Sequence, residues 1–349
     1  MNQSRKIITA MIRVAIDKGL RDMEVNAGRG IRNLLDLGTY FSKGQDQKNF
    51  FAQAQKIMNN KNSRYYTLIR RLIHNVDHKI IKTFGINLGY NSLIYGAGII
   101  KEREKEYGFN IPWPIIFDLR SLNDVISISD IAETLSCGES LGIYCGMFFI
   151  DNDKDYLQEL IKTLATYKES AYFLFVPPKI LTDEIAIEAV EAGNIAIIFQ
   201  LPAPAESFED LETAANTLLK HKCLFGIYSL YDANNLAYIT SNGYVKLIED
   251  LNSTFAFLIK KSTLKNEKRF LSSLTDTRSA EGFPFLFIDF YNDLASINEL
   301  ISGQNPFLTI KANGSIDFKL IDTPAEDLNI KRHSLPTILE RLLPRTQYV

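Results

Sequence analysis

The stretch GFNIPWPIIFDLRSLNDVISISDI, from Gly108 to Ile131, decides how the rest of the chain is interpreted. Its apolar run from Pro114 to Phe117 predicts a strand that is buried on both faces. A short polar loop from Asp118 to Asn123 follows the strand, and a helix is predicted after the loop. A buried strand that leads into a helix is the first part of a βαβ unit, so this stretch predicts a parallel sheet.

The same alternation of strand and helix continues along the chain, and most of the strands are nearly continuous apolar runs. Strands are predicted at Ile115–Leu119, Gly142–Ile150, Ala171–Val176, Asn194–Gln200, Leu224–Leu230, Thr254–Lys260 and Phe285–Phe290. Helices fit between them at Ser129–Ser136, Asp155–Thr166, Asp183–Ala192, Ser207–Lys220, Ser241–Asp250 and Lys265–Leu274. This repetition predicts a parallel barrel or a large open sheet. Asn305–Leu320, with Asn313-Gly314 at its turn, predicts a β-hairpin after the barrel.

The first hundred residues have the spacing of helices. These are predicted at Arg5–Leu20, Ile31–Phe41, Asp46–Asn59, Ser63–Asn75 and His78–Phe84. The first is amphipathic and basic, so it either packs on its own domain or lies on a membrane surface. Gly85, Gly89, Gly96 and Gly98 follow, and they indicate close backbone approach or positive φ.

Composition excludes several classes of function. The 349 residues are 46% hydrophobic and 23% charged, which predicts a large core. A net charge of −2 removes the electrostatic case for nucleic acid as the main partner. No apolar run is long enough to span a bilayer, and the N-terminus lacks the pattern of a signal peptide, so we expect a cytoplasmic protein without an integral membrane segment.

The cysteines do not form a metal-binding or disulfide pattern. Cys137, Cys145 and Cys223 are the three in the chain, and no two of them are close in sequence. An odd number in a cytoplasmic chain argues against a disulfide framework. Cys145 and Cys223 fall at or within predicted strands, where a cysteine behaves as a small buried hydrophobe.

Several stretches resemble a clostridial-type branch of the radical SAM superfamily. They are NLGYNSLIYGAGIIKEREKEYGFNIPW before the first strand, the run that ends LGIY, the strand AYFLF, and CLFGIYSLYDANNLAYITSNGY. The resemblance covers about Ile31 to Leu339. It implies an α/β fold in which an N-terminal helical segment precedes a partial (βα) TIM barrel, and a C-terminal segment of the kind that binds an auxiliary cluster.

The chain departs from that family at the residues that carry the chemistry. The family has three cysteines for an iron–sulfur cluster after the first strand, where this chain has Asp118-Leu119-Arg120-Ser121-Leu122-Asn123. The family's glycine-rich turn after the second strand, which meets SAM, is replaced by Ile150-Asp151-Asn152-Asp153. The C-terminal hairpin has no cysteine. Since iron–sulfur clusters are held by thiolates, we expect no cluster, no other cofactor and no reductive cleavage of SAM.

Two classes of function remain. The first is a pseudoenzyme that binds or assists a small-molecule or peptide substrate, or a catalytically intact relative. The second is a repurposed enzyme with carboxylate or metal-assisted chemistry at the carboxyl ends of the strands, where such barrels carry their active groups. For the second class the candidates are Asp118, Asp151 and Asp289. Arg120, Gln200, Tyr231 and Lys260 are the candidate ligand contacts at the same strand ends.

The predicted organisation has three segments. A helical segment covers residues 1–108, the partial barrel covers 109–292, and the hairpin and tail cover 293–349. One short helix is expected in the tail, near Thr337–Leu343.

Overall fold

The structure is a computed structural model. It describes the chain apart from residues 1–2, 43, 122–124, 152, 202–208, 240, 262–271, 273–274, 277, 279–281, 304–306, 318–327 and 346–349. It forms two compact units, each built from two separate stretches of sequence. Unit 1 comprises Met1–Ile86 and Leu201–Phe290, and unit 2 comprises Asn87–Gln200 and Tyr291–Val349.

Unit 2 contains the strand that follows the opening stretch. Its strands are β1 (Pro114–Asp118), β2 (Cys145–Phe149), β3 (Ala171–Val176), β4 (Ile195–Gln200), β8 (Leu308–Lys311) and β9 (Ile316–Asp317). They lie in the order β4-β3-β2-β1-β8-β9. All neighbouring pairs are parallel except β8 and β9, which form the predicted antiparallel hairpin. The hairpin therefore continues the sheet beside β1.

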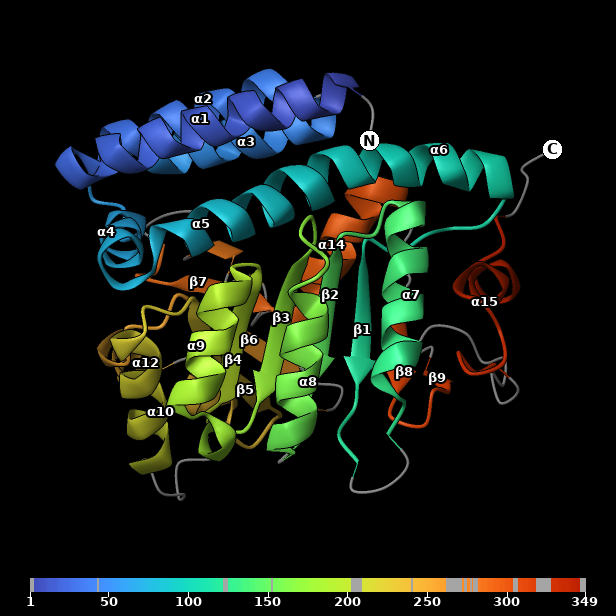
Figure 1. Cartoon of the computed structure of the whole chain (residues 1–349). Helices are drawn as coiled ribbons and strands as arrows, with labels where there is room; N and C mark the ends of the chain where they lie inside the picture. Colours follow the sequence, from blue (N-terminus) through green and yellow to red (C-terminus); the bar gives the residue numbers. More distant parts are fainter. Residues whose placement is uncertain are drawn as a thin grey trace. The chain divides into compact units, whose positions relative to one another are not determined.

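Helices cover one face of this sheet. Figure 1 shows α7 (Ile128–Leu141), α8 (Lys154–Leu164) and α9 (Asp183–Ala192) side by side over β1 to β4. Ser127 and Asp130 form a capping box at the start of α7, which satisfies backbone donors of its first turn. Gly142, with φ of 97°, ends this helix and turns the chain toward β2. Each apolar strand is thus buried under the helix of its own crossover.

The other described helical elements of unit 2 lie before β1, between β3 and α9, and near the C-terminus. A π-helix (Ile86–Gly96), whose first residue belongs to unit 1, leads into α6 (Ala97–Tyr107). The side chains of Asn87 and Asn91 hold the π-helix to the backbone carbonyls of Lys168, Glu169 and Ser170. Short 3-10 helix η2 (Pro178–Ile180), α14 (Phe290–Ser302) and α15 (Leu335–Leu342) complete the set. The last of these is the predicted tail helix.

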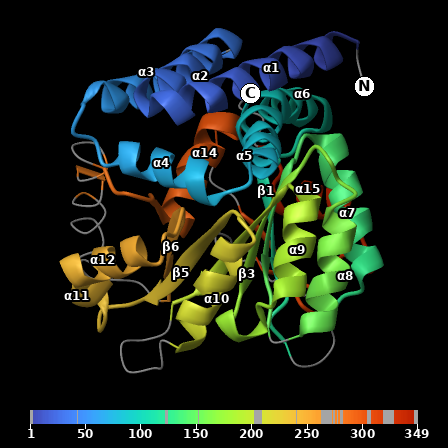
Figure 2. The same ribbon diagram turned by 60° about the vertical axis from the view of Figure 1, so that its left-hand side comes forward.

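The N-terminal helices belong to unit 1. They are α1 (Gln3–Val25), α2 (Ala27–Phe41), α3 (Gln45–Asn59), α4 (Tyr65–Asn75) and α5 (His78–Gly85). The first three lie side by side in Figure 2. Buried Met23, Met58 and Ile69 join α1, α3 and α4 in one apolar cluster. The predicted helical segment is confirmed.

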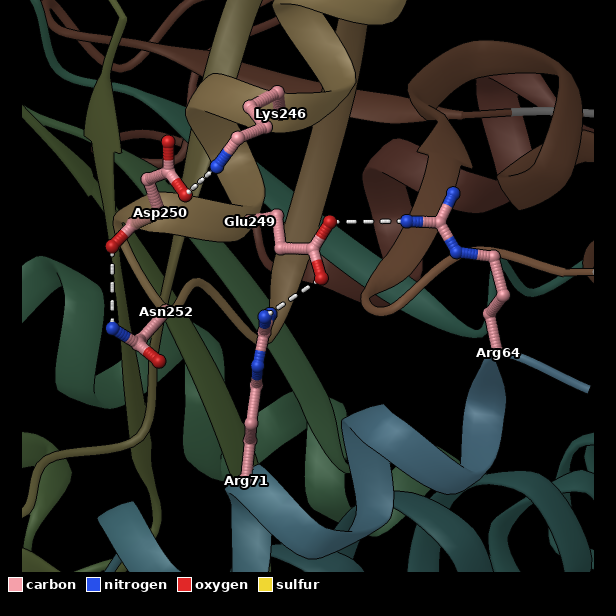
Figure 3. A network of polar contacts seen from close by, with 6 residues as sticks. All are labelled: Arg64, Arg71, Lys246, Glu249, Asp250 and Asn252. Atoms are coloured by element: carbon pink, nitrogen blue, oxygen red, sulfur yellow. Dashed lines mark hydrogen bonds and ion pairs between the residues drawn. The ribbon is translucent and has the colours of Figure 1, made fainter.

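The strands of unit 1 are parallel to one another. They are β5 (Phe225–Tyr231), β6 (Phe255–Lys260) and β7 (Leu286–Asp289), with α10 (Glu209–Lys220), α11 (Leu236–Ile239) and α12 (Asn242–Asp250). Figure 3 shows how α12 is tied to α4: Glu249 accepts hydrogen bonds from Arg64 and Arg71, each at 3.0 Å. This ion-paired contact fixes the helical segment to the β5–β6 connection.

Every predicted strand is present within two or three residues of its predicted ends, and Ala171–Val176 is matched to the residue. The predicted helix Lys265–Leu274 lies almost wholly outside the described residues. The predicted segment boundaries at residues 108 and 292 stay predictions. Among the described residues, no helix has both the length and the apolarity needed to cross a membrane.

Candidate functional site

The two faces of the unit 2 sheet can be told apart from the contacts of β1. Gly138 of α7 lies against the side chain of Ile115, so Ile115 and Phe117 point toward the helices. Because side chains alternate along a strand, Ile116 and Asp118 point to the opposite face. Asp118 is aligned with Phe149 of β2 on one side and with Lys311 of β8 on the other. These three side chains therefore share that face at the carboxyl edge of the sheet.

Asp118 is the centre of an ion-paired network. Its Oδ1 accepts a hydrogen bond from Arg120 Nε at 2.7 Å, and its Oδ2 accepts one from Arg120 Nη2 at 3.0 Å. Lys311 Nζ lies 3.8 Å from Asp118 Oδ2 and 2.9 Å from Asp317 Oδ2. Burial acts to raise the pKa of Asp118, but the hydrogen bonds and charge of Arg120, with the charge of Lys311, outweigh it and lower that pKa. Asp118 is thus a carboxylate already neutralised by two cations.

Aromatic rings lie beneath this network. The Arg120 guanidinium carbon is 5.0 Å from the centre of the Phe149 ring, and Phe149 stacks on Phe175 at 4.3 Å. Both rings are buried. A guanidinium that lies over an aromatic ring and is bound at two points to a carboxylate has little freedom to move. Arg120 therefore covers the Phe149 ring of this stacked pair.

Asp151 and Gln200 lie at the ends of neighbouring strands. Asp151 comes two residues after Phe149, and Gln200 two residues after Ile198, which is aligned with Phe175. Both are partly exposed. Unit 2 thus brings four of the predicted site residues, Asp118, Arg120, Asp151 and Gln200, to one edge of one sheet. Phe149 and Lys311 belong to the same group and were not predicted.

The other predicted residues lie in unit 1, at the ends of consecutive strands. Tyr231 ends β5, Lys260 ends β6 beside it, and Asp289 ends β7. The Tyr231 hydroxyl donates a hydrogen bond of 2.9 Å to Asp289 Oδ2, and both side chains are almost completely buried. This is a buried carboxylate with a buried hydroxyl donor.

The contacts of α12 identify the face on which that pair lies. Tyr244 of α12 donates a hydrogen bond of 2.7 Å to Ser229 and contacts the Phe287 ring. Tyr231 follows Ser229 by two residues and Asp289 follows Phe287 by two, so both share the α12-covered face of their strands. Asp118 and Asp151 lie in unit 2 and Asp289 in unit 1, so a single cluster of the three aspartates stays a prediction.

The residues present do not fit an iron–sulfur cluster. Cys137 lies in α7, Cys145 begins β2, and Cys223 precedes β5. Cys145 and Cys223 are buried near the amino ends of their strands, away from the carboxyl edge, as expected of structural cysteines. Burial raises the pKa of both thiols, that of Cys223 to about 12. A cluster needs several thiolates at one point, and the loop after β1 has an arginine–aspartate pair instead.

The described residues at the position of the family's SAM-binding turn also differ from that turn. Ile150 is buried, and its amide donates a hydrogen bond of 2.9 Å to the Phe175 carbonyl, which continues the strand ladder. Its side chain occupies space that a glycine-rich turn would leave to a ligand. Among the residues that the structure describes, no three His, Cys, Asp or Glu side chains are grouped so as to hold a metal ion.

Comparison with known proteins finds solved structures of similar fold but no relative by sequence. No protein-family model matches the chain, and no curated protein matches it. Among solved structures the chain is similar to SuiB of Streptococcus suis bound to S-adenosylmethionine, with a TM-score of 0.52 and 12% identity. That match covers 68% of this chain and 66% of SuiB, just under two thirds. A second SuiB structure matches with a TM-score of 0.52 and 11% identity, over 79% of this chain and 81% of SuiB.

The SuiB structures share the α/β fold of this chain, so the fold class expected from the resemblance is confirmed. The chain has an α/β fold with a radical-SAM-like partial (βα) barrel, an N-terminal helical segment and a C-terminal β-hairpin. At this identity the likeness shows the fold alone.

Proposed function

We propose that this chain is a cluster-less, radical-SAM-like pseudoenzyme, related to the clostridial-type branch, that acts in the cytoplasm as a binding or accessory protein. The observation that carries the proposal is the network at the carboxyl end of β1. Where the family has its cluster cysteines, Arg120 is bound at two points to Asp118 and lies on Phe149. A stable, internally satisfied contact stands where a cluster-bearing loop would be needed.

The second support is that the scaffold is intact. The strands of both units remain apolar and buried, and the crossover helices α7 and α8 keep their N-caps. A chain under no requirement to fold would accumulate charges in its strands. We infer that the fold is retained for binding, although the groups for SAM chemistry are missing.

The proposed partner is a catalytically intact relative, or the peptide or small-molecule substrate that such a relative modifies. Arg120 and Gln200 in unit 2, with Lys260 in unit 1, are the residues proposed to contact it at the strand ends. Tyr231, also a candidate contact from the sequence, is 0% exposed and bonded to Asp289, so it is not proposed to contact the partner. On the helical segment, the Tyr40 side chain is 78% exposed, and an exposed tyrosine is a common anchor for a protein partner. Tyr66, by contrast, packs within the bundle and donates a hydrogen bond to the Met58 carbonyl.

The proposal that the chain holds no iron–sulfur cluster and does not cleave SAM is tested by anaerobic reconstitution with iron and sulfide. We expect no stoichiometric iron–sulfur absorption, and no 5′-deoxyadenosine when SAM and a strong reductant are added. A radical SAM enzyme with its three cysteines, treated in parallel, is the positive control. A stoichiometric cluster, or SAM cleavage above the level of buffer, would overturn the proposal. Calorimetry with SAM alone is expected to show no binding.

The proposal that the chain binds a partner is tested by affinity capture from the native cell under gentle conditions. Wild type and a Tyr40→Ala variant are compared, with Tyr107→Ala as a control because Tyr107 is also exposed but lies in unit 2. We expect a specific partner that is lost or weakened with Tyr40→Ala and kept with the control. Recovery of no partner by wild type would contradict this half.

The alternative function is a repurposed enzyme that uses Asp118, Asp151 and Asp289. What favours it is the place of Asp118 and Asp151 at adjacent strand ends of unit 2. The pairing of Asp118 with Arg120 and Lys311 weighs against a cation ligand, since the carboxylate charge is already compensated. A measurable turnover that the triple alanine variant loses, with no partner captured, would favour the enzyme over the accessory protein.

A further inference from the structure

The outward face of α1 carries apolar side chains where a surface helix is usually polar. Met11, Val14 and Val25 are 55%, 69% and 90% exposed. They are three of the eight large hydrophobic side chains that are exposed in the described part of the chain. The opposite face of α1 makes the packing contacts, and Ile12 and Leu20 there are each 4% exposed. Helix α1 thus packs on its own unit through one face and presents apolar side chains to solvent on the other.

The exposed apolar side chains belong to one line along the helix, which we call the α1 stripe. Its members are Met11, Val14, Lys18, Arg21 and Val25, and all five are exposed. They follow one another at alternating steps of three and four residues, which keeps them on one side of the helix for about four turns. The same alternation is the repeat by which one helix packs along another. The stripe therefore has the pattern of a seam for a second helix, with apolar ends and two cations at its centre.

The acidic and basic side chains of α1 differ in their partners. Each acidic side chain lies beside a side-chain nitrogen of α2 or α5: the pairs are Asp17 with Lys82, Asp22 with Asn33 and Glu24 with His78, at 2.9, 3.1 and 3.7 Å. Arg13, Lys18 and Arg21 are exposed, and no hydrogen bond or ion pair links them to a described residue. The fold of unit 1 thus engages the acids of α1 and leaves three positive charges on its outward side.

These charges decide which partner fits the α1 stripe. A second copy of the stripe is disfavoured, because Lys18 and Arg21 at its centre would meet the same two cations in either direction. A membrane surface is disfavoured as well, since the two cations interrupt the apolar side chains and no aromatic ring is present on the stripe. A helix with carboxylates at its centre and apolar side chains on either side of them complements both features.

We propose that the α1 stripe is the docking surface for an acidic amphipathic helix of a partner protein. Carboxylates of that helix pair with Lys18 and Arg21, and its apolar side chains cover Met11, Val14 and Val25. This inference rests on the binding function proposed above, to which it adds a surface and the chemistry of the partner.

Fluorescence anisotropy with a labelled synthetic peptide tests the docking on the full chain. The peptide is a helix of about three heptads, with leucine at the outer seam positions and glutamate opposite Lys18 and Arg21. We expect saturable binding that weakens as salt is added, because exposed ion pairs are screened. Lys18→Glu/Arg21→Glu should weaken it about tenfold or more, since two attractive pairs become repulsive. Lys48→Glu/Lys56→Glu, which changes the net charge equally at exposed cations of α3, should bind as wild type.

A charge-swapped peptide distinguishes a specific contact from damage to the fold. With lysine in place of its glutamates, the peptide should bind Lys18→Glu/Arg21→Glu more tightly than wild type. Absence of saturable binding of the acidic peptide to wild type, or equal binding to wild type and Lys18→Glu/Arg21→Glu, would overturn the proposal. So would co-sedimentation of wild type with phosphatidylserine vesicles in place of binding to the peptide.

Affinity capture from the native cell separates failure of this inference from failure of the proposed function. We expect the captured partner to be lost with Lys18→Glu/Arg21→Glu and kept with Lys48→Glu/Lys56→Glu. A partner that Lys18→Glu/Arg21→Glu keeps would overturn docking at the α1 stripe and leave the binding function standing. Recovery of no partner by wild type would contradict the binding function itself, and with it the inference.

Discussion

Arg120 reaches back two residues to bind Asp118 through both Nε and Nη2, at 2.7 and 3.0 Å, while its guanidinium lies over the ring of Phe149. The contact joins the loop after β1 to the ends of β1 and β2. The ion pair between Lys311 and Asp118 connects the end of β8 to the same contact. The backbone from Asp118 to Arg120 is thereby tied to the ends of three strands by polar groups.

Replacement of Arg120 by glutamine should destabilise the chain by about 1 kcal/mol, because the pair is charge-assisted but partly exposed to solvent. The pKa of Asp118 is lowered in the folded chain, so this stabilisation is present above the ordinary pKa of aspartate and is lost as the pH falls below it. Urea unfolding at pH 7 and at pH 3 measures the difference. Lys154→Gln, which breaks the more exposed pair with Glu184, is the control and should cost less.

Tyr231→Phe should cost about 1–3 kcal/mol of unfolding free energy, because it removes a hydroxyl donor from the buried carboxylate of Asp289. Urea unfolding followed by circular dichroism measures it. Tyr40→Phe removes a hydroxyl that is exposed to water and should leave the stability unchanged. Equal stability of Tyr231→Phe and wild type would show that this hydrogen bond contributes nothing to the fold.

The strands could be predicted because burial on both faces leaves a local signature. Ala171–Val176 was matched to the residue since all six of its side chains are apolar and buried. The partners of a strand leave no such signature. The sequence around Leu308 does not indicate that β8 pairs with β1. The position of Lys311 beside Asp118 could therefore not be predicted.

The glycine-rich segment shows a second limit of prediction. Gly96 does have the expected close approach, to Gly142. A methyl group on Gly85, Gly89 or Gly98 would meet nothing within 4 Å, and none of these three glycines has a positive φ. The backbone there is a π-helix, held by Asn87 and Asn91 to a loop about eighty residues away. A tertiary contact decides that conformation, and the local sequence does not contain it.

Glu104 should make the stability of the chain fall as the pH rises. Its folded pKa is about 7 against an ordinary 4.5, so the folded chain keeps a proton that the unfolded chain has released. The resulting stabilisation is complete below the unfolded pKa and lost as the pH rises through about 7, which amounts to about 3 kcal/mol at most.

Urea unfolding of wild type and Glu104→Gln at pH 5 and pH 8 measures this effect, since the difference between the two proteins cancels the other titrating groups. Wild type should lose stability relative to the variant between these pH values. Glu102→Gln, one exposed residue on the same helix, should show no such pH dependence. If wild type were more stable relative to Glu104→Gln at pH 8 than at pH 5, the raised pKa of Glu104 would be contradicted.

Gly96 and Gly98 provide a matched pair of substitutions at the start of α6. A methyl group at Gly96 would lie 2.3 Å from the backbone oxygen of Gly142, which cannot move without shifting the turn between α7 and β2. Gly96→Ala should therefore destabilise the chain by about 1–3 kcal/mol, the usual cost of overpacking, even though its φ of −60° suits alanine. Gly98 has open space around it within the helix, so Gly98→Ala should stabilise by about 0.5–1 kcal/mol. Thermal unfolding of both variants measures these effects. If the unfolding midpoint moved in the same direction in the two variants, the close packing of α6 against the turn at Gly142 would be contradicted.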